Sequence, residues 1–391
     1  MPFTDKKFER DQYRVTVSHV TSARPSSSAE GPLMKGGGEA METDVPRYPL
    51  LQFEMDLERY VEDFSQDVVG AYGAGHGGDL PADSGAARSL IPPGTGVFRD
   101  FSHVAPALPT FIADNCVACM ECVTACPDTA ILGKVAEPDE VEAVQTAIQD
   151  ADEQADFRAQ WVTTQKFHSL LEKKGQKGGL FAIYIDPSKC KGCGECVVVC
   201  GDHQALEMAD KEALLPVCRV RLKHMRELPE TPERFLEKNL PIDAMLKEDR
   251  ALLYAGGAGS CAGCGEATAV RMMLAATGEQ FAHNEIAIVA ATGCNTVYGS
   301  TFPYNPYRIT WTNSLFENAA TVAMGVRARW DQQGWQAKRL WVLGGDGAMY
   351  DIGFQALSRL LVSGMDVKVL VLDTQVYSNT GGQASTASFT G

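Results

Sequence analysis

Eight of the twelve cysteines fall into two runs that share one spacing. In each run, two residues lie between the first and second cysteines and two between the second and third. Three residues lie between the third and fourth. This spacing is typical of loops that hold [4Fe–4S] clusters, because the short gaps let three thiolates of one loop reach one cubane. The runs are Cys116, Cys119, Cys122 and Cys126, followed by a proline, and Cys190, Cys193, Cys196 and Cys200, followed by a glycine.

The fourth cysteine of each run is expected to serve the cluster of the other run, as in two-cluster ferredoxins. A pair of Cys₄ zinc sites is the alternative, since zinc also binds thiolates with two-residue gaps. Two complete four-cysteine runs favour clusters. One cluster then takes Cys116, Cys119, Cys122 and Cys200, and the other takes Cys190, Cys193, Cys196 and Cys126.

A third group consists of Cys261, Cys264 and Cys294, three thiolates where a cubane needs four. The group is either a cluster whose fourth ligand lies beyond Gly391, a redox dithiol or half a zinc site. The remaining cysteine, Cys218, follows apolar residues and is expected to be a buried structural thiol.

A glycine-rich turn at residues 344–348 follows an apolar stretch at 340–343 and precedes a helical pattern. Glycines in this context let backbone N–H groups approach a phosphate at a helix N-terminus. Asp346, in the middle of the turn, suits Mg²⁺, which prefers oxygen ligands and bridges to diphosphate oxygens. A G-D-G sequence alone is more often a plain turn.

A second set of oxygen donors follows the next apolar stretch, 370–372, and Asp373, in the loop 374–379. Ligands of open α/β sheets bind at the carboxyl ends of the strands, where hydroxyl, carbonyl and amide groups of this loop would meet the G-D-G turn. The two loops together therefore favour a metal–diphosphate site over a plain turn.

Strands and helices must position these groups. Strands expected at 285–291, 339–343 and 366–373 alternate with helices at 315–332 and 350–362, which is the pattern of a parallel α/β sheet. Nearer the N-terminus, a helical excursion at 135–174 and a short strand at 181–185 separate the cysteine runs. We predict an α/β and α+β multidomain chain, with a two-cluster ferredoxin-like domain before an incomplete parallel-sheet domain.

Composition divides the chain into five expected segments. Pro/Ser-rich and Gly-rich stretches near the start predict disorder, and a polar Glu/Lys-rich passage separates the two domains. The segments are a disordered tail (1–48), a linker or remnant of an upstream domain (49–105), the ferredoxin-like domain (106–226), a linker (227–250) and the incomplete sheet domain (251–391).

The bulk composition excludes several classes of function. With 35 basic and 50 acidic side chains, the formal charge of −15 disfavours nucleic acid and anionic membranes as partners. No run of 18 apolar residues is present, and the residues after Met1 lack the apolar core of a secretory signal. We therefore expect a soluble, cytoplasmic protein, whose cysteines bind metal rather than form disulfides.

Four motifs together resemble pyruvate:ferredoxin (flavodoxin) oxidoreductase. They are the two ferredoxin-type runs, the string S-C-A-G-C-G-E at 260–266, T-G-C at 292–294, and G-D-G with the string D-T-Q-V-Y-S-N-T-G-G-Q at 373–383. They occur in the order of that family, and the resemblance extends from about Pro93 to the end of the chain.

The resemblance implies roles for individual residues. It implies that Asp346, the Thr374 hydroxyl and the Val376 carbonyl bind Mg²⁺, that Glu266 and Cys294 touch thiamine diphosphate, and that Asn379 faces the substrate. Cys261, Cys264 and Cys294 resemble ligands of a cluster next to the thiamine, with a fourth cysteine further downstream. The residues expected to hold the diphosphate are Gly345, Asp346, Gly347, Ala348, Thr374, Gln375, Val376, Tyr377, Ser378 and Asn379.

The resemblance also implies an activity, the oxidative decarboxylation of pyruvate to acetyl-CoA and CO₂, with electrons passed through [4Fe–4S] clusters to ferredoxin or flavodoxin. Domains that activate the thiamine and serve coenzyme A in this family are not recognised here, so further domains or subunits are expected and the chain alone should be inactive. The alternatives are a non-catalytic polyferredoxin-like electron-transfer subunit, and the same chemistry on another 2-oxoacid.

Overall fold

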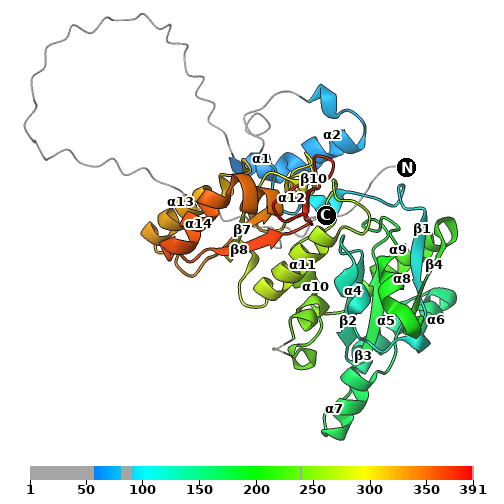
Figure 1. Ribbon diagram of the computed structural model, residues 1–391. Helices are drawn as coiled ribbons and strands as arrows, with labels where there is room; N and C mark the ends of the chain where they lie inside the picture. Colours follow the sequence, from blue (N-terminus) through cyan, green and yellow to red (C-terminus); the bar gives the residue numbers. More distant parts are fainter. Residues whose placement is uncertain (1–56, 81–89, 238–239, 390–391) are drawn as a thin grey trace, which may run out of the picture.

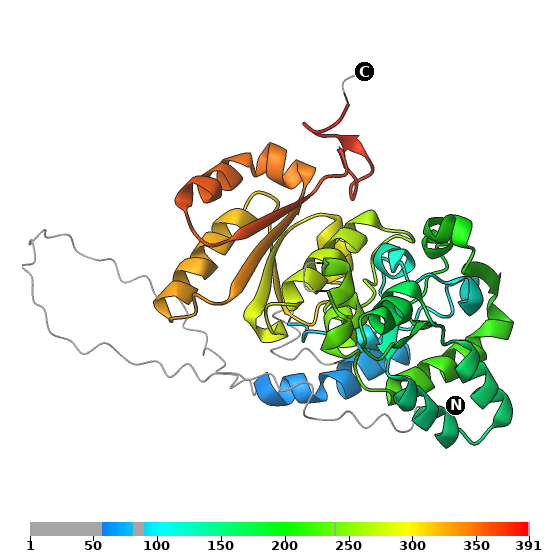
Figure 2. The same cartoon turned by 90° about the horizontal axis from the view of Figure 1, so that it is seen from below.

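The computed structural model describes residues 57–80, 90–237 and 240–389. Figures 1 and 2 show two parts side by side, one built around the two cysteine runs and one around a parallel sheet. The tail expected at 1–48 lies outside the described residues.

In the first part, each cysteine run lies between two strands and includes a short helix. The first strand of each half pairs antiparallel with the last strand of the other half, so the two halves interlock (Figure 1). The first half contains β1 (Ala107–Phe111), α4 (Glu121–Ala125) and β2 (Ile131–Ala136), and the second contains β3 (Leu180–Ile185), α8 (Glu195–Cys200) and β4 (Leu206–Asp210).

The excursion between the halves is helical, as expected. Asp150 caps the second of its helices by accepting hydrogen bonds from the N–H groups of Asp152 and Glu153. Two hydrogen bonds from Arg221 to Asp156, of 2.8 and 2.6 Å, hold this helix against the long helix that follows β4. The helices are α5 (Pro138–Ala147), α6 (Ala151–Ala159), η5 (Gln165–Ser169), α7 (Leu170–Lys173) and, after β4, α9 (Lys211–Glu227).

The passage expected as a linker at 227–250 packs into the core instead of spanning solvent. Phe235, Met245 and Leu246 are buried with the cysteine-bearing part. Charged residues around them dominate the local composition, so the sequence shows no clear apolar pattern at these positions. The passage forms η7 (Glu233–Phe235), η8 (Pro241–Leu246) and α10 (Glu248–Ala251).

A four-stranded parallel sheet with the order β6-β5-β7-β8 forms the second part. Three strands, β5 (Ile286–Ala291), β7 (Arg339–Gly345) and β8 (Lys368–Leu372), confirm the predicted ones within a few residues. The edge strand β6 (Thr310–Ser314) was not predicted, because its polar and partly exposed side chains give no apolar pattern.

Helices cover both faces of this sheet (Figure 2). Along β5, Ile288 and Ala290 pack toward α11, whereas Val289 and Ala291 pack toward α13 and α14, as the two-residue period of a strand requires. The helix expected at 350–362 divides in two, η10 and α14. The bounds are α11 (Gly265–Gly278), α12 (Cys294–Gly299), α13 (Ala319–Gln332), η10 (Gly347–Ile352) and α14 (Phe354–Ser363), with a final hairpin of β9 (Val376–Tyr377) and β10 (Gln383–Ala384).

The described part of the segment expected at 49–105 docks on the sheet-bearing part. Phe64, Val68 and Val69 bury their side chains with Tyr304. Thr95 donates a 2.9 Å hydrogen bond from its hydroxyl to the Pro303 carbonyl. The elements here are α1 (Leu57–Phe64), η1 (Ser65–Val69), α2 (Gly70–Gly73), η2 (Gly77–Asp79) and η3 (Thr95–Phe98). Within the described ranges, no helix combines the length and apolar character that crossing a bilayer requires.

Candidate cofactor-binding sites

The eight cysteines of the two runs line two cavities. Three cysteines of the first run and the last of the second line a pocket of about 350 Å³, open solvent included, here named the outer cavity. Three cysteines of the second run and the last of the first line a pocket of about 340 Å³, open solvent included, here named the inner cavity. This is the crossed grouping expected from the spacing, while ligation itself stays a prediction. The outer cavity has Cys116, Cys119, Cys122 and Cys200, and the inner cavity has Cys190, Cys193, Cys196 and Cys126.

The backbone of the two loops follows one path around these cavities. Two residues after the first cysteine, Ala118 and Gly192 have φ of 60° and 70°. Four residues after it, Met120 and Gly194 have φ of 68° and 82°. The left-handed region costs a non-glycine residue roughly 1 kcal/mol, so the first loop bears a strain that the glycines of the second avoid.

Backbone N–H groups point at the sulfurs in a matched pattern. Ala118 N lies 3.4 Å from Cys116 Sγ, and Gly192 N lies 3.4 Å from Cys190 Sγ. The fourth cysteines also match, because Cys126 Sγ and Cys200 Sγ each accept from an alanine N–H at 3.2 Å. Such donors stabilise thiolate sulfur, so both cavities suit a thiolate-bound group.

Burial opposes ionisation of these thiols in the absence of metal. It raises the pKa of Cys116 to about 11 and that of Cys190 to about 12. Because metal binding needs thiolates, iron must displace these protons. Among the described residues, no three His, Cys, Asp or Glu side chains converge closely enough for one metal ion. Binding of a cluster, rather than of the single zinc ion of the alternative, stays a prediction from the cysteine spacing.

The G-D-G turn and the loop after β8 meet at the carboxyl edge of the sheet, where Gly345 pairs with Leu372 in the β-register. The Thr374 hydroxyl lies 3.3 Å from Asp346 Oδ1 and 3.0 Å from the Val376 carbonyl oxygen. Asp346 is 1% exposed. The structure thus brings together the three groups expected to bind Mg²⁺, and an oxygen-only donor set of this kind fits that ion.

Sequence reasoning missed two residues that fix this loop. Ser385 donates a hydrogen bond to Asp346 Oδ2. Asp351 accepts a 2.7 Å hydrogen bond from the Tyr377 hydroxyl, and its hydrogen bonds with Thr386 and Tyr377 lower its pKa. The only available signal was the Ser/Thr-rich composition of the final residues, which gave no partner.

Gly347 is required by the close approach of Tyr377. A Cβ atom at Gly347 would clash with Cε1 and Cδ1 of that ring, whereas one at Gly345 would meet its nearest atom, the Leu372 carbonyl oxygen, at 3.8 Å. The remaining loop residues of the expected diphosphate set, Gln375 and Asn379, are placed in the same loop, Gln375 with φ of 63°. Ala348 is buried beneath the turn.

The third cysteine group gathers where α11 and α12 begin. Cys264 directly precedes α11, and Cys294 is the first residue of α12. Burial raises the pKa of Cys264 and of Cys294, and the nearby Cys261 thiol raises both further. Cys294 Sγ also lies 3.4 Å from Ser378 Oγ. The three thiols thus lie together beside the loop 374–379, while Cys218 is buried in the core of the other part, as expected.

Glu266 places a protonatable carboxyl group near this site. Its pKa is raised to about 7, chiefly by burial. A hydrogen bond donated by the Tyr298 hydroxyl at 3.5 Å lowers this pKa, and the negative charge of Asp346 raises it. Both residues expected to touch thiamine, Glu266 and Cys294, therefore lie within electrostatic range of each other.

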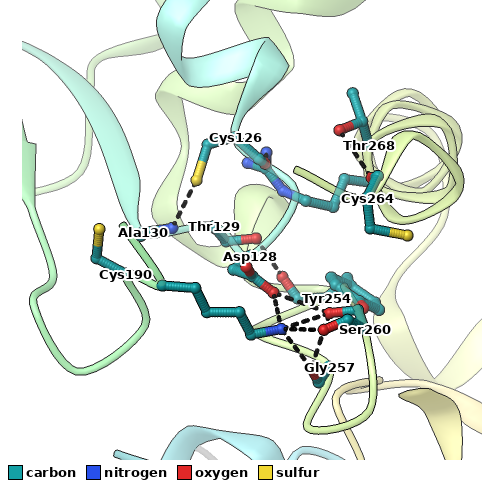
Figure 3. Close-up of polar contacts among 12 residues, drawn as sticks. Cys126, Asp128, Thr129, Ala130, Cys190, Tyr254, Gly257, Ser260, Cys264 and Thr268 are labelled. Atoms are coloured by element: carbon teal, nitrogen blue, oxygen red, sulfur yellow. Dashed lines mark hydrogen bonds and ion pairs between the residues drawn. The ribbon is translucent and has the colours of Figure 1, made fainter. Parts of the chain in front are cut away.

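A buried polar network joins the inner cavity to the loop that carries Cys261 (Figure 3). Lys191 forms an ion pair of 3.0 Å with Asp128 and donates a 2.8 Å hydrogen bond to the Gly257 carbonyl. Ser260 donates to Asp128 at 3.2 Å, and the Thr129 hydroxyl donates to the Tyr254 carbonyl at 2.6 Å. Sequence reasoning did not single out these residues.

Comparisons with known proteins agree with this geometry. Residues 291–391 match the family model of the thiamine pyrophosphate enzyme C-terminal TPP binding domain, and residues 182–206 match that of a 4Fe-4S binding domain. The pyruvate-flavodoxin oxidoreductase of Nostoc sp. (strain PCC 7120 / SAG 25.82 / UTEX 2576) is 27% identical over 83% of this chain and 32% of its own length. The pyruvate:ferredoxin oxidoreductase of Moorella thermoacetica is 27% identical over 84% of this chain and 32% of its own. The resemblance to pyruvate:ferredoxin (flavodoxin) oxidoreductases is confirmed.

This chain spans about a third of the length of these pyruvate:ferredoxin (flavodoxin) oxidoreductases. The TPP-domain match includes Cys294, Asp346 and the loop 374–379, and the 4Fe-4S match includes the second cysteine run. A solved 2-oxoglutarate:ferredoxin oxidoreductase from Magnetococcus marinus is 21% identical over 31% of this chain and 36% of that one, with a TM-score of 0.24.

Proposed function

We propose that this chain forms the electron-conducting and diphosphate-binding portion of a pyruvate:ferredoxin or pyruvate:flavodoxin oxidoreductase. The complete enzyme would convert pyruvate and coenzyme A to acetyl-CoA and CO₂. One observation carries the proposal: two crossed four-cysteine cavities and the Asp346, Thr374 and Val376 oxygen set occur in one chain, with a third cysteine group between them.

The thiamine site would be held by the two loops at the carboxyl edge of the sheet. When bound, thiamine diphosphate supplies an electron sink for the carbanion left by decarboxylation of a 2-oxoacid. Asp346, the Thr374 hydroxyl and the Val376 carbonyl would bind Mg²⁺, and the N–H groups of 345–348 and 374–379 would face the diphosphate. Glu266 and Cys294 would contact the cofactor, and Asn379 would face the substrate.

The cysteines would hold the electron path. The inner and outer cavities would each hold one [4Fe–4S] cluster, ligated across the two runs. Cys261, Cys264 and Cys294 would supply three ligands to a third cluster, with the fourth from a part of the enzyme outside the described residues. Ferredoxin or flavodoxin would accept the electrons.

Other parts of the enzyme would complete the reaction. The proposal assigns coenzyme A binding and thiamine activation to further domains or subunits, and places the enzyme in the cytoplasm, where reducing conditions keep thiols free. It divides the present chain into a ferredoxin-like unit at 106–226 and a thiamine-binding unit at 251–391, although 227–250 shares the core of the first.

Two alternatives make different predictions. An electron-transfer subunit without catalysis would bind clusters but no thiamine, and the gathering of Asp346, Thr374 and Val376 speaks against it. An enzyme acting on another 2-oxoacid would bind the same cofactors. Pyruvate is favoured only because the relatives named above are pyruvate enzymes.

The test is to purify the chain without oxygen, reconstitute it with iron and sulfide, and titrate thiamine diphosphate with Mg²⁺. About eight irons per chain together with thiamine binding support the proposal. About eight irons without thiamine binding would leave the electron-transfer alternative. Rates of viologen reduction with pyruvate, 2-oxoglutarate and branched 2-oxoacids, measured on the complete enzyme, then decide the substrate.

A further inference from the structure

Arg271 is a buried arginine that contacts the first cysteine run beside the inner cavity. It is 1% exposed and lies on α11, seven residues beyond Cys264. Its Nη1 donates to the carbonyl oxygens of Val123, at 3.0 Å, and of Cys126, itself one of the inner cysteines. Its Nε and Nη2 have no hydrogen-bond partner among the described residues.

A buried guanidinium with two unpaired nitrogens is costly unless negative charge lies nearby. Asp128 is within electrostatic range of Arg271, but it already forms the ion pair with Lys191. Among the described residues around the inner cavity, three cations, Arg271, Lys189 and Lys191, therefore exceed the one carboxylate, Asp128. The remaining positive charge lies against the inner cysteines, because the Arg271 guanidinium donates to the carbonyl oxygen of Cys126.

The outer cavity provides an internal comparison. The backbone N–H groups of Ala118 and Ala205 lie 3.4 and 3.2 Å from its sulfurs, and the matching distances in the inner cavity are the same. The charges differ, because Lys189, Lys191 and Asp128 line the inner cavity, whereas among the described residues only His203 joins the cysteines as a titratable group lining the outer cavity. At the position of Lys191 the first run has Val117.

A [4Fe–4S] cluster with four thiolates carries net negative charge, and one-electron reduction adds another. We propose that Arg271 is the buried counter-charge of the inner cluster and raises its reduction potential, whereas Asp128 lowers it. This inference rests on the proposed function, because it needs a cluster in the inner cavity. Since Cys264 directly precedes α11, the same helix would link the third cysteine group to a cluster whose potential favours accepting its electron.

The test compares reduction potentials in the reconstituted chain. Arg271→Met removes the charge, Arg271→Lys keeps it, and Asp128→Asn removes the opposing charge. Arg327→Met is the matched control, because Arg327 is also 1% exposed but lies on α13, where it bonds Asp331. Each variant is poised at a series of potentials and read by electron paramagnetic resonance, with the Cys200→Ala variant assigning the inner signal.

At the midpoint potential of the wild-type inner cluster, Arg271→Met should lower its ratio of reduced to oxidised cluster by roughly tenfold or more. Arg271→Lys should stay near wild type, Asp128→Asn should raise the ratio, and the outer cluster and the Arg327→Met variant should not change. An inner potential unchanged in a cluster-loaded Met variant, or an equal shift in both clusters, would overturn the inference.

If the Arg271→Met variant fails to hold clusters, the reduction potential of the inner cluster in Asp128→Asn becomes the test. A raised potential supports the inference, and an unchanged or lowered one overturns it. A wild-type chain that assembles no clusters would overturn the proposed function itself and the inference with it. A wild-type chain with two clusters and unresponsive potentials would leave the proposed function standing and remove only the role of Arg271.

Discussion

The Ser378 hydroxyl lies 3.4 Å from the Cys294 sulfur, although 84 positions of sequence separate the two residues. Cys294 follows β5 and Ser378 follows β8, and the parallel order of the sheet brings the ends of these strands to one edge. The loop expected to hold thiamine diphosphate and a cysteine expected to bind a third cluster are therefore neighbours. An electron leaving the first would have a short path to the second.

Replacing Asp346 with asparagine should weaken Mg²⁺-dependent thiamine diphosphate binding by on the order of 10–100-fold. The amide keeps the shape of the side chain but removes the charge that would bind the cation. Calorimetric titration with the cofactor and Mg²⁺ measures the effect, and the iron content should not change.

Asp366→Asn is the control for this change, because Asp366 pairs with Arg339 and Lys368 at the opposite end of the same two strands. Equal binding by the Asp346→Asn variant and the wild type would show that Asp346 does not hold the metal. Loss of iron in that variant would show that the two parts of the chain are not separate sites.

Replacing Cys200 with alanine should empty the outer cavity and spare the inner one, although Cys200 belongs to the second run. Iron content should fall from about eight to about four per chain, with loss of the signals of the outer cluster. Cys218→Ala removes an equally buried thiol away from both cavities and should keep all the iron. Loss of the inner cluster in Cys200→Ala would refute the crossed assignment.

Replacing Glu266 with glutamine should stabilise the metal-free and cofactor-free chain at high pH. The pKa of Glu266 rises from an ordinary 4.5 to about 7, so the folded chain holds this proton more tightly than the unfolded chain. The stability that this protonated carboxyl group contributes is fully present below pH 4.5 and is lost as the pH rises through about 7. The Tm advantage of Glu266→Gln should therefore grow across this interval.

Glu142→Gln, on an exposed position of α5, controls for the loss of one carboxylate. Melting curves at several pH values in the presence of a chelator supply the measurement. A Tm difference between Glu266→Gln and wild type that stays constant over this range would show that burial does not perturb Glu266.

Replacing Gly347 with alanine should destabilise the chain by about 1–3 kcal/mol, because the new methyl group displaces the Tyr377 ring and its hydrogen bond to Asp351. Gly345→Ala, two residues earlier, meets no atom closer than 3.8 Å and should cost less than about 0.5 kcal/mol. Denaturant unfolding compares the two variants, and equal losses would contradict the contact between Gly347 and Tyr377.

Strands with a strong apolar signal were readable from the sequence, as β5 and β7 show. The edge strand β6 was not, because an edge position at partial exposure tolerates Thr and Asn and so leaves no alternation to detect. The passage 227–250 was expected to be a linker, but it packs into the core. Its few buried residues, such as Phe235 and Leu246, lie among many charged ones, so the local composition is polar.

Site residues with fixed spacing could be named in advance, since the two cysteine runs and the G-D-G turn each occupy a few consecutive positions. Partners that meet only in the folded chain could not. Ser385 reaches Asp346 across 39 positions, and Arg271 reaches Cys126 across 145. Neither residue belongs to a motif, so nothing in the sequence distinguished it from an ordinary serine or arginine.

The proposed exchange of the fourth cysteine between the two runs has a consequence for damage to the clusters and their repair. Oxidation of a single sulfur, Cys126 or Cys200, would disable the cluster housed mainly by the opposite half of the interlocked strands. Neither half could then assemble or repair its cluster alone, and the two clusters would form or be lost together. Cluster assembly would therefore need iron and sulfide to reach a chain in which the two halves have already paired their strands.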